Sequence, residues 1–117
     1  MIPGKPHHNL DAWKESMALV GTVYEATRDF PPEETYALAS QLRRAADSIP
    51  GNLAEAAGRD GHKEFAGIAR GSLSELQTQL LIAADPGYLA RKHRAFVLPD
   101  RVSRLLAGLH NSVAAPG

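Results

Sequence analysis

The feature that most constrains the fold is the spacing of apolar residues between positions 10 and 30, which follows the α-helical repeat in two adjacent stripes. The stripes are Leu10, Trp13, Met17, Val20 and Tyr24, and beside them Ala12, Ser16, Leu19, Val23, Ala26 and Phe30. Steps of three and four residues fit a helix and do not fit the two-residue alternation of a strand. We therefore predict a first helix that is capped by Asn9 or Asp11. The Pro31-Pro32 pair is expected to end it, because a proline disfavours helical geometry in the residue before it.

Three further segments show the same kind of amphipathic pattern. The positions on these faces, apolar except for Ser72, are Leu38, Leu42, Ala45, Ile49, Leu53 and Ala56; then Phe65, Ile68, Ala69, Ser72, Leu73, Leu76, Leu80 and Ala83; and finally Leu98, Val102, Leu105, Leu106, Leu109 and Val113. We expect the second helix to open with Glu33 and Glu34, acids that suit the positive end of a helix dipole, and to end near Gly58. The third helix is expected to stop at the Asp85-Pro86-Gly87 turn. The fourth is expected to carry Pro99 in its first turn.

Pro50 lies inside the second apolar pattern, which resumes in helical phase after it. A proline removes one helical hydrogen bond and crowds the preceding turn. Because the phase is kept, we expect Pro50 to bend the second helix without ending it. After the third helix, Tyr88 and Leu89 are expected to fold back onto the core as an apolar lid. The polar stretch from Arg91 to Arg94 is expected to be irregular.

These patterns predict an all-α protein, an antiparallel up-down-up-down four-helix bundle. The bundle is expected to span residues 9–113, with residues 1–8 as a flexible N-terminal tail and residues 114–117 as a frayed C-terminus. A chain of 117 residues, of which 44% are apolar and 22% charged, suits a single ordered domain.

The sequence shows no recognisable catalytic or cofactor chemistry. It contains no cysteine, which excludes disulfides and thiolate zinc sites and favours a reducing compartment. The five histidines form neither an i, i+4 pair nor a Glu-x-x-His arrangement, so we expect surface histidines and no metal. Ser72 lacks the nucleophile-elbow motif, and no phosphate-binding glycine loop is present. We expect a protein that is not an enzyme and binds no cofactor. Because no signal peptide or membrane-spanning run is visible, we expect it to be cytoplasmic.

Charge is balanced overall but uneven along the chain. Thirteen basic and thirteen acidic side chains give zero net charge, whereas residues 1–34 carry −3, residues 35–85 carry −1 and residues 86–117 carry +4. A dedicated nucleic-acid binder usually has a larger basic excess, so only local contacts are candidates. The candidate contacts are Arg59, Lys63, Arg70, Arg91, Lys92 and Arg94. The run Gly58-Arg59-Asp60-Gly61 has the spacing of a KH-domain loop, but no sheet accompanies it, and a helix–helix turn is the better interpretation.

Polar residues form a stripe on the second and third predicted helices. On the second predicted helix the stripe consists of Gln41, Arg44, Ser48, Asn52, Glu55 and Arg59. On the third it consists of Ser72, Glu75 and Gln79. If the two helices form a hairpin about residue 60, positions equally far from that residue face each other. Ser48 then lies opposite Ser72, and Arg43 or Arg44 lies near Glu75. Two interpretations remain open: two solvated faces, or a partly buried network of Arg43, Arg44, Ser48, Asn52, Glu55, Ser72 and Glu75.

The two stripes of the first helix form an apolar face that is wider than one neighbouring helix covers. One stripe is expected to face the core, and the other to remain as a patch that a second copy covers. The sequence does not say which stripe faces outward, so the candidate oligomer face draws on both, namely Trp13, Met17, Val20, Tyr24, Leu19, Val23 and Phe30. The alternative is a monomer in which neighbouring helices on two sides absorb both stripes.

Several short motifs, in order along residues 9–89, resemble those of one protein family. They are Leu10-Asp11-x-Trp13, Ser40-Gln41-Leu42-Arg43-Arg44-Ala45-Ala46, Ser48-Ile49-Pro50, Asn52-Leu53-Ala54-Glu55, Gly58-Arg59, Lys63-Glu64-Phe65, Gly71-Ser72-Leu73-x-Glu75-Leu76 and Gly87-Tyr88-Leu89. In these motifs the chain is similar to the four-helix-bundle proteins encoded within intervening sequences of bacterial 23S ribosomal RNA genes. The resemblance implies a bundle that assembles into a ring-like homopentamer, and kinship with the basic, nucleic-acid-binding accessory protein of diversity-generating retroelements. It implies no catalytic residue.

Three functions are compatible with these features. The first is a non-catalytic oligomeric interaction protein, an adaptor for RNA or for an RNA-handling partner. The second is a direct nucleic-acid binder that uses local basic patches, and its affinity would fall steeply with salt as phosphate counterions are released. The third is a small-ligand-binding bundle or an enzyme, which requires a pocket with convergent polar groups that the sequence does not show. We expect a homo-oligomer with no membrane association and no evident small-molecule substrate.

Overall fold

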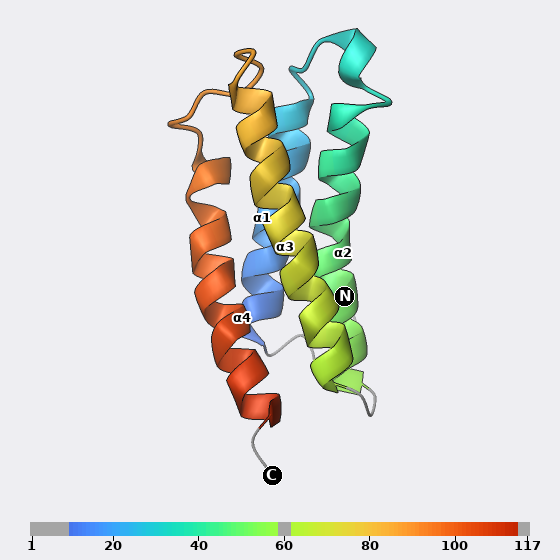
Figure 1. Cartoon of the computed structure of the whole chain (residues 1–117), viewed down its shortest axis with the longest axis vertical. Helices are drawn as coiled ribbons and strands as arrows, with labels where there is room; N and C mark the ends of the chain where they lie inside the picture. Colours follow the sequence, from blue (N-terminus) through green and yellow to red (C-terminus); the bar gives the residue numbers. More distant parts are fainter. Residues whose placement is uncertain (1–9, 59–61, 115–117) are drawn as a thin grey trace.

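The computed structural model describes residues 10–58 and 62–114, and within these ranges the chain forms four α-helices and no strand. The helices are α1 (Asp11–Thr27), α2 (Leu38–Gly58), α3 (His62–Ala84) and α4 (Leu98–Ala114), with the short 3-10 helices η2 (Pro32–Glu34) and η3 (Arg94–Phe96) between them. Figure 1 shows the four helices side by side, each running against the one before it. The predicted all-α, antiparallel four-helix bundle is confirmed. The predicted tail at residues 1–8 lies outside the described residues. Of the predicted frayed C-terminus at residues 114–117, Ala114 is instead the last residue of α4, and the rest lies outside the described residues.

The order of the helices around the bundle follows their order in the chain. α1 and α3 each pack against both α2 and α4, whereas α1 and α3 lie diagonally across the core. An ion pair between the exposed Arg101 of α4 and the half-buried Glu15 of α1, with 2.9 Å between Nε and Oε1, spans the side where the last helix meets the first. Because consecutive helices are neighbours, the side between α1 and α2 lies opposite the side between α3 and α4.

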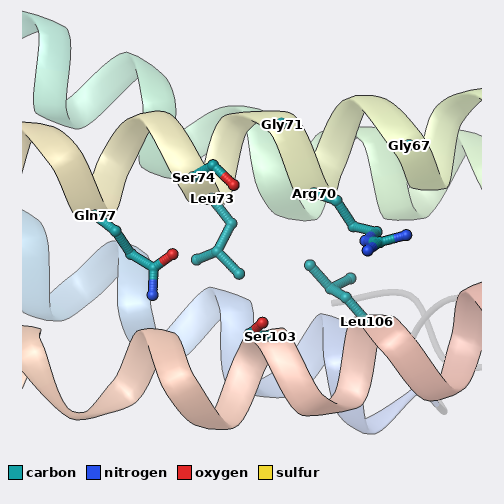
Figure 2. A pocket seen from close by; sticks show the side chains of 8 residues that line it. All are labelled: Gly67, Arg70, Gly71, Leu73, Ser74, Gln77, Ser103 and Leu106. Atoms are coloured by element: carbon teal, nitrogen blue, oxygen red, sulfur yellow. The ribbon is translucent and has the colours of Figure 1, made fainter.

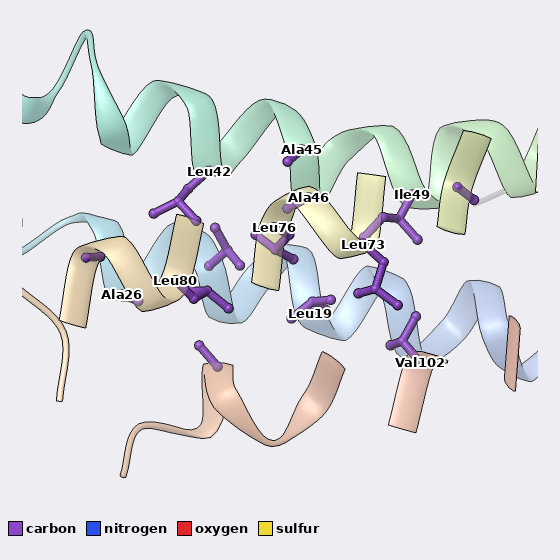
Figure 3. Close-up of a cluster of buried hydrophobic side chains, with 14 of the residues drawn as sticks. Leu19, Ala26, Leu42, Ala45, Ala46, Ile49, Leu73, Leu76, Leu80 and Val102 are labelled. Carbon is purple, nitrogen blue, oxygen red and sulfur yellow. The ribbon is translucent and has the colours of Figure 1, made fainter. Parts of the chain in front are cut away.

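The core is built from the apolar stripes of all four helices. Leu19, Leu42, Leu76 and Leu106 come from α1, α2, α3 and α4 in turn, and each is at most 1% exposed. Figure 3 shows such side chains interleaved between the helices, with alanines of α2 among them. A fully buried leucine contributes roughly 1.5–3 kcal/mol relative to an exposed one, so this cluster supplies much of the drive to fold.

α1 begins and ends slightly inside its predicted limits. Leu10 occupies the cap position and no side chain caps the helix, so Asp11 is not the cap. The Asp11 carboxylate instead lies in the first turn of α1, where the helix dipole favours an acid. Asn9, the other predicted cap, lies outside the described residues. The last helical residue is Thr27, and the Phe30 amide donates to the Thr27 carbonyl at 3.2 Å in the turn that follows.

α2 begins later than predicted. The prediction that it opens at Glu33 is wrong, because residues 32–34 form η2 and α2 begins only at Leu38. The amides of Glu34 and Thr35 donate to carbonyls three residues earlier, at 2.9 and 3.2 Å. This tighter pattern directly follows the proline pair, and it delays the regular helix by about one turn.

Pro50 lies inside α2, which is continuous from Leu38 to Gly58. The prediction that Pro50 does not end the helix is therefore confirmed. A proline has no amide hydrogen, so the carbonyl four residues before it loses its usual donor. Ile49 and Leu53, on either side of Pro50, are both fully buried, and this packing holds the helix in the core on both sides of the missing bond.

α3 ends in a turn that returns the chain to the core. Gly87 has a φ of 87°, in the left-handed region that favours glycine. The amides of Gly87 and Tyr88 donate at 3.0 Å to carbonyls of the last turn of α3, in the pattern of a Schellman motif. Leu89 is buried, and the Tyr88 ring lies 5.7 Å from the Phe30 ring. The predicted apolar lid is confirmed.

The connection into α4 contains η3. His93 precedes this short helix, and its Nδ1 accepts a hydrogen bond from the amide of Ala95 at 3.0 Å. Pro99 is buried in the first turn of α4, as predicted. At the other end of the bundle, the predicted helix–helix turn at residues 58–61 lies almost entirely outside the described residues.

Candidate interaction surfaces

A polar seam joins α2 to α3. The hydroxyl oxygens of Ser48 and Ser72 lie 2.8 Å apart and share a hydrogen bond. The Asn52 side-chain amide donates to the Ser48 carbonyl at 2.8 Å and to the Ser48 hydroxyl at 3.0 Å. These three side chains are half-buried, as is Glu55 three residues further along α2. The structure thus places Ser48 opposite Ser72 and partly hides the pair from water.

The remaining residues of the predicted network point elsewhere. Arg44 is exposed, and Glu75 is exposed and accepts a hydrogen bond at 3.1 Å from Gln79 of its own helix. Gln79 is buried, and its Oε1 accepts no hydrogen bond from the described part of the chain. Of the two arginines expected as alternatives near Glu75, Arg43 has a different neighbour. Arg43 lies on the α1 side of α2, where its Nε donates to the Thr27 hydroxyl at 2.8 Å.

A polar cluster between α1 and α2 was not predicted from the sequence. The Tyr24 hydroxyl donates to Asp47 Oδ2 at 2.8 Å, and the Arg43 guanidinium lies 5.3 Å from the centre of the Tyr24 ring. The hydrogen bond to Asp47 raises the pKa of the Tyr24 hydroxyl; burial and the charge of Asp47 act in the same direction, and Arg43 opposes them. The available signal was the four-residue spacing of Arg43 and Asp47, which puts both on one face of α2.

The outward stripe of α1 is the one that contains Met17. Leu19 and Val23 are fully buried and Phe30 is 7% exposed, so the prediction that these three belong to an oligomer face is wrong. Their stripe faces the centre of the bundle. Met17 and Tyr24 are 45% and 41% exposed, and Trp13 and Val20 of the same stripe are half-buried at the edge of the core. Leu10 precedes the helix, and the part of the stripe within it, which we call the α1 flank, consists of Trp13, Met17, Val20 and Tyr24.

Three of the predicted nucleic-acid contacts lie together in the connection between α3 and α4. Arg91, Lys92 and Arg94 are all exposed there. The Arg91 guanidinium lies 5.2 Å from the centre of the Phe96 ring, a cation–π contact that holds it beside the start of α4. Three cations therefore share one short segment at the end of the bundle.

The other three predicted contacts do not join this group. Arg70 is exposed on α3, fourteen residues before Ala84. At a rise of about 1.5 Å per residue, it lies roughly 20 Å along the helix from the connection. Arg59 and the side chain of Lys63 lie outside the described residues.

A groove runs along the side of the bundle between α3 and α4. Its larger part has a volume of about 270 Å³ and is lined by Gly67, Arg70, Gly71, Leu73, Ser74, Gln77, Ser103 and Leu106. A second hollow of about 140 Å³ shares Gln77 and is otherwise lined by Leu80, Leu81, Phe96 and Pro99. Figure 2 shows Leu73 and Leu106 pointing toward each other between the two helices, with Ser74, Gln77 and Ser103 around them. Leu73 and Leu106 form the buried floor of the larger hollow, whose exposed lining is more polar than apolar and has Arg70 as its charged residue.

Small residues of α3 create this groove. Gly67, Gly71 and Ser74 recur at steps of four and three residues on one face of α3 and all line the larger hollow. Outside the backbone of α3 itself, no atom beyond the adjacent residues lies within 4 Å of the position that a β-carbon would take at either glycine. The glycine spacing was visible in the sequence, but nothing in it showed that α4 lies beside this face.

The described residues show neither a metal site nor a membrane span. Within residues 10–58 and 62–114, no three histidine, aspartate or glutamate side chains are placed to hold a metal ion. None of the described helices combines the length and apolar character that a bilayer crossing requires.

Four antiparallel helices in a closed order, with an apolar flank on one side and a small-residue groove on the opposite side, define an all-α four-helix-bundle protein. The sequence profile of the family described as 23S rRNA-intervening sequence protein matches residues 8–108. The chain belongs to this family, and the resemblance seen in its motifs is confirmed. A search among curated proteins found no match.

Proposed function

We propose that the chain is a non-catalytic, self-associating cytoplasmic bundle that serves as an adaptor for RNA or for an RNA-handling partner. The observation that carries this proposal is the α1 flank, where Met17 and Tyr24 remain exposed on a bundle whose core is already filled. Soluble proteins usually cover a contiguous apolar patch with a partner. A second copy of the chain is the partner that is present wherever the chain itself is present.

The RNA part of the proposal is supported by the family. Its description refers to intervening sequences of 23S rRNA. Such a sequence, as a labelled transcript, is therefore the first RNA to try. A mobility shift that requires host extract is expected for an adaptor, and a shift with the protein alone indicates direct binding. If the transcript shifts in neither condition, the RNA part of the proposal is wrong.

Solution mass tests self-association. Light scattering at micromolar concentration is expected to give a multiple of 12.6 kDa, and the family resemblance favours five copies. Met17→Glu is expected to lower the mass, because a buried unpaired charge opposes association. Ala18→Glu is the matched control, since Ala18 is also exposed but is turned by about 100° from Met17 around α1. A wild-type mass of 12.6 kDa overturns the proposal.

Direct nucleic-acid binding is a second candidate, favoured by the charge of the α3–α4 half. Residues 62–108 contain seven basic and four acidic side chains, and three of the basic ones share the exposed connection before α4. If Arg91, Lys92 and Arg94 bind phosphates, replacing all three with alanine should reduce the slope of log affinity against log salt by about 2 for a single strand. Arg44→Ala, which removes an exposed cation from α2, should leave the slope unchanged.

A further inference from the structure

We propose that the groove between α3 and α4 receives the α1 flank of a second copy, so that copies join head-to-tail through two different surfaces. The inference rests on the self-association proposed above and names the surfaces that carry it. Position, shape, spacing and charge of the described residues support it.

The flank and the groove lie on opposite sides of the bundle. The flank lies toward α2, because the Tyr24 hydroxyl reaches Asp47 on that helix. The groove lies between α3 and α4, on the side that faces away from the α1–α2 pair. One copy therefore cannot cover its own flank with its own groove. Each contact between copies leaves one flank and one groove open, which is the property of a heterologous interface.

The two surfaces are complementary in shape. Met17 and Tyr24 are the exposed side chains of the flank, with 45% and 41% of their surfaces exposed. Gly67, Gly71 and Ser74 leave a hollow of about 270 Å³ above the buried Leu73 and Leu106. Helices pack by inserting projecting side chains into the spaces between those of a neighbour, and the flank and groove supply the two halves of such a contact.

The residues of the two surfaces recur with the same spacing. The flank occupies positions 13, 17, 20 and 24, and Arg70, Ser74, Gln77 and Leu81 of the groove repeat its steps of four, three and four. α1 and α3 run in the same direction, and Tyr24 and Leu81 each lie three residues before the end of their helix. Two copies side by side at equal height place Tyr24 against Leu81 and position 17 against Ser74. The same register sets the Trp13 ring against the Arg70 guanidinium, a favourable cation–π pair.

Charge complementarity favours the same arrangement. Residues 11–58, which hold α1 and α2, contain four basic and eight acidic side chains, a net charge of −4. Residues 62–108, which hold α3 and most of α4, contain seven basic and four acidic side chains, a net charge of +3. A contact between two flanks would bring like charges together, whereas a flank in a groove brings opposite charges together and orients the approach.

Cross-linking between introduced cysteines tests the inference directly, because the chain has no cysteine of its own. With a short bismaleimide, the double variant Met17→Cys/Ser74→Cys is expected to give a ladder of covalent dimers and larger species. Each single variant alone is expected to stay monomeric on a denaturing gel, and a mixture of the two is expected to stop at the dimer. In the control, Ala18→Cys replaces Met17→Cys and should abolish the ladder.

A second variant tests the groove without cross-linking. Gly71→Trp places an indole ring at the exposed hollow, where the added β-carbon meets no side chain or neighbouring helix within 4 Å. It is expected to keep the helical circular dichroism of the wild type and to fall to a mass of 12.6 kDa. The inference is overturned if the wild type is oligomeric but Gly71→Trp retains its mass, or if Met17→Cys alone cross-links to a dimer. Either result leaves self-association intact, whereas a monomeric wild type removes both proposals.

Discussion

At the scale of single residues, Arg43 ties the outer edge of α2 to α1 through two contacts. Its Nε donates to the Thr27 hydroxyl at 2.8 Å, and its guanidinium lies over the Tyr24 ring. The Thr27 hydroxyl in turn donates to the Val23 carbonyl at 2.8 Å. A lysine would not replace Arg43, because an ammonium cannot combine a planar stacking face with a laterally directed N–H donor.

The Tyr24 hydroxyl is expected to ionise at a higher pH than the ordinary tyrosine value of 10.0. The hydrogen bond to Asp47 stabilises its protonated form. The resulting stability is fully present below the unfolded pKa and is lost as pH rises through the folded pKa. An alkaline absorbance titration of the wild type minus that of Tyr24→Phe isolates this hydroxyl, and Asp47→Asn is expected to lower its pKa. An unchanged titration in Asp47→Asn would show that the carboxylate is not the cause.

The hydroxyl pair of the polar seam is expected to behave as one unit. Ser72→Ala should lower the free energy of unfolding by about 1 kcal/mol, because it leaves the half-buried Ser48 hydroxyl without its partner on α3. The double variant with Ser48→Ala should lose less than the sum of the two single changes, since both hydroxyls are then absent. Urea unfolding of the four proteins measures the coupling. Strictly additive losses would mean that the two hydroxyls do not interact.

At the scale of elements, α2 carries a helix-breaking residue in its interior and is nevertheless continuous. The buried side chains on both sides of Pro50 oppose the local loss of a hydrogen bond. Stability of this helix therefore comes from its packing against α1 and α3 more than from its own backbone, as is common for helices in folded proteins.

Pro50→Ala is expected to raise the free energy of unfolding by about 1 kcal/mol. The regained hydrogen bond and the better helix propensity stabilise the fold by roughly 3 kcal/mol. The loss of the packing of the buried proline ring offsets part of this stabilisation. Urea unfolding measures the result. Gly51→Ala is the matched control: it adds a β-carbon with no atom within 4 Å, so it isolates the effect of propensity. A destabilised Pro50→Ala variant would show that the ring's packing matters more than the missing bond.

Helical periodicity was sufficient to predict the four helices, because it is set within each segment. The start of α2 was not predictable in this way, since Glu33 and Glu34 suit the opening of a helix and a 3-10 turn equally well. The choice between the stripes of α1 depended on where α2 and α4 lie. For the same reason, the sequence left Arg43 and Arg44 as alternatives beside Glu75 and did not indicate that Arg43 contacts α1. The predicted pairing of Ser48 with Ser72 required only that α2 and α3 form a hairpin.

The groove between α3 and α4 could not be predicted from the sequence. Gly67 and Gly71 indicate a narrow strip on α3, but a narrow strip can bring two helices close together or leave a hollow between them. Which of these occurs depends on the distance between α3 and α4, between which the buried Leu73 and Leu106 point toward each other. The position of one helix relative to another is a property of the whole core.

At the scale of the whole molecule, the separation of charge predicts that self-association is sensitive to salt. The halves that carry −4 and +3 attract each other across a head-to-tail contact, and the screening length falls from about 10 Å at 0.1 M salt to about 3 Å at 1 M. The mass from light scattering, at a protein concentration where assembly is incomplete, is expected to fall over this range. Arg70→Gln should weaken the salt dependence, and Arg44→Gln should not. A mass that rises with salt would assign the association to apolar contacts.

Because the number of antiparallel helices is even, Asp11 and Ala114 lie at one end of the bundle, and the connections at residues 28–37 and 85–97 lie at the other (Figure 1). Any assembly whose axis runs along the bundle then has two unlike rims. One rim gathers the first and last helical residues of every copy. The other gathers the connections at residues 28–37 and 85–97, of which the first carries acids and the second carries cations. Such an object has a polarity, and a tag fused to either end of the chain would leave these two connections uncovered.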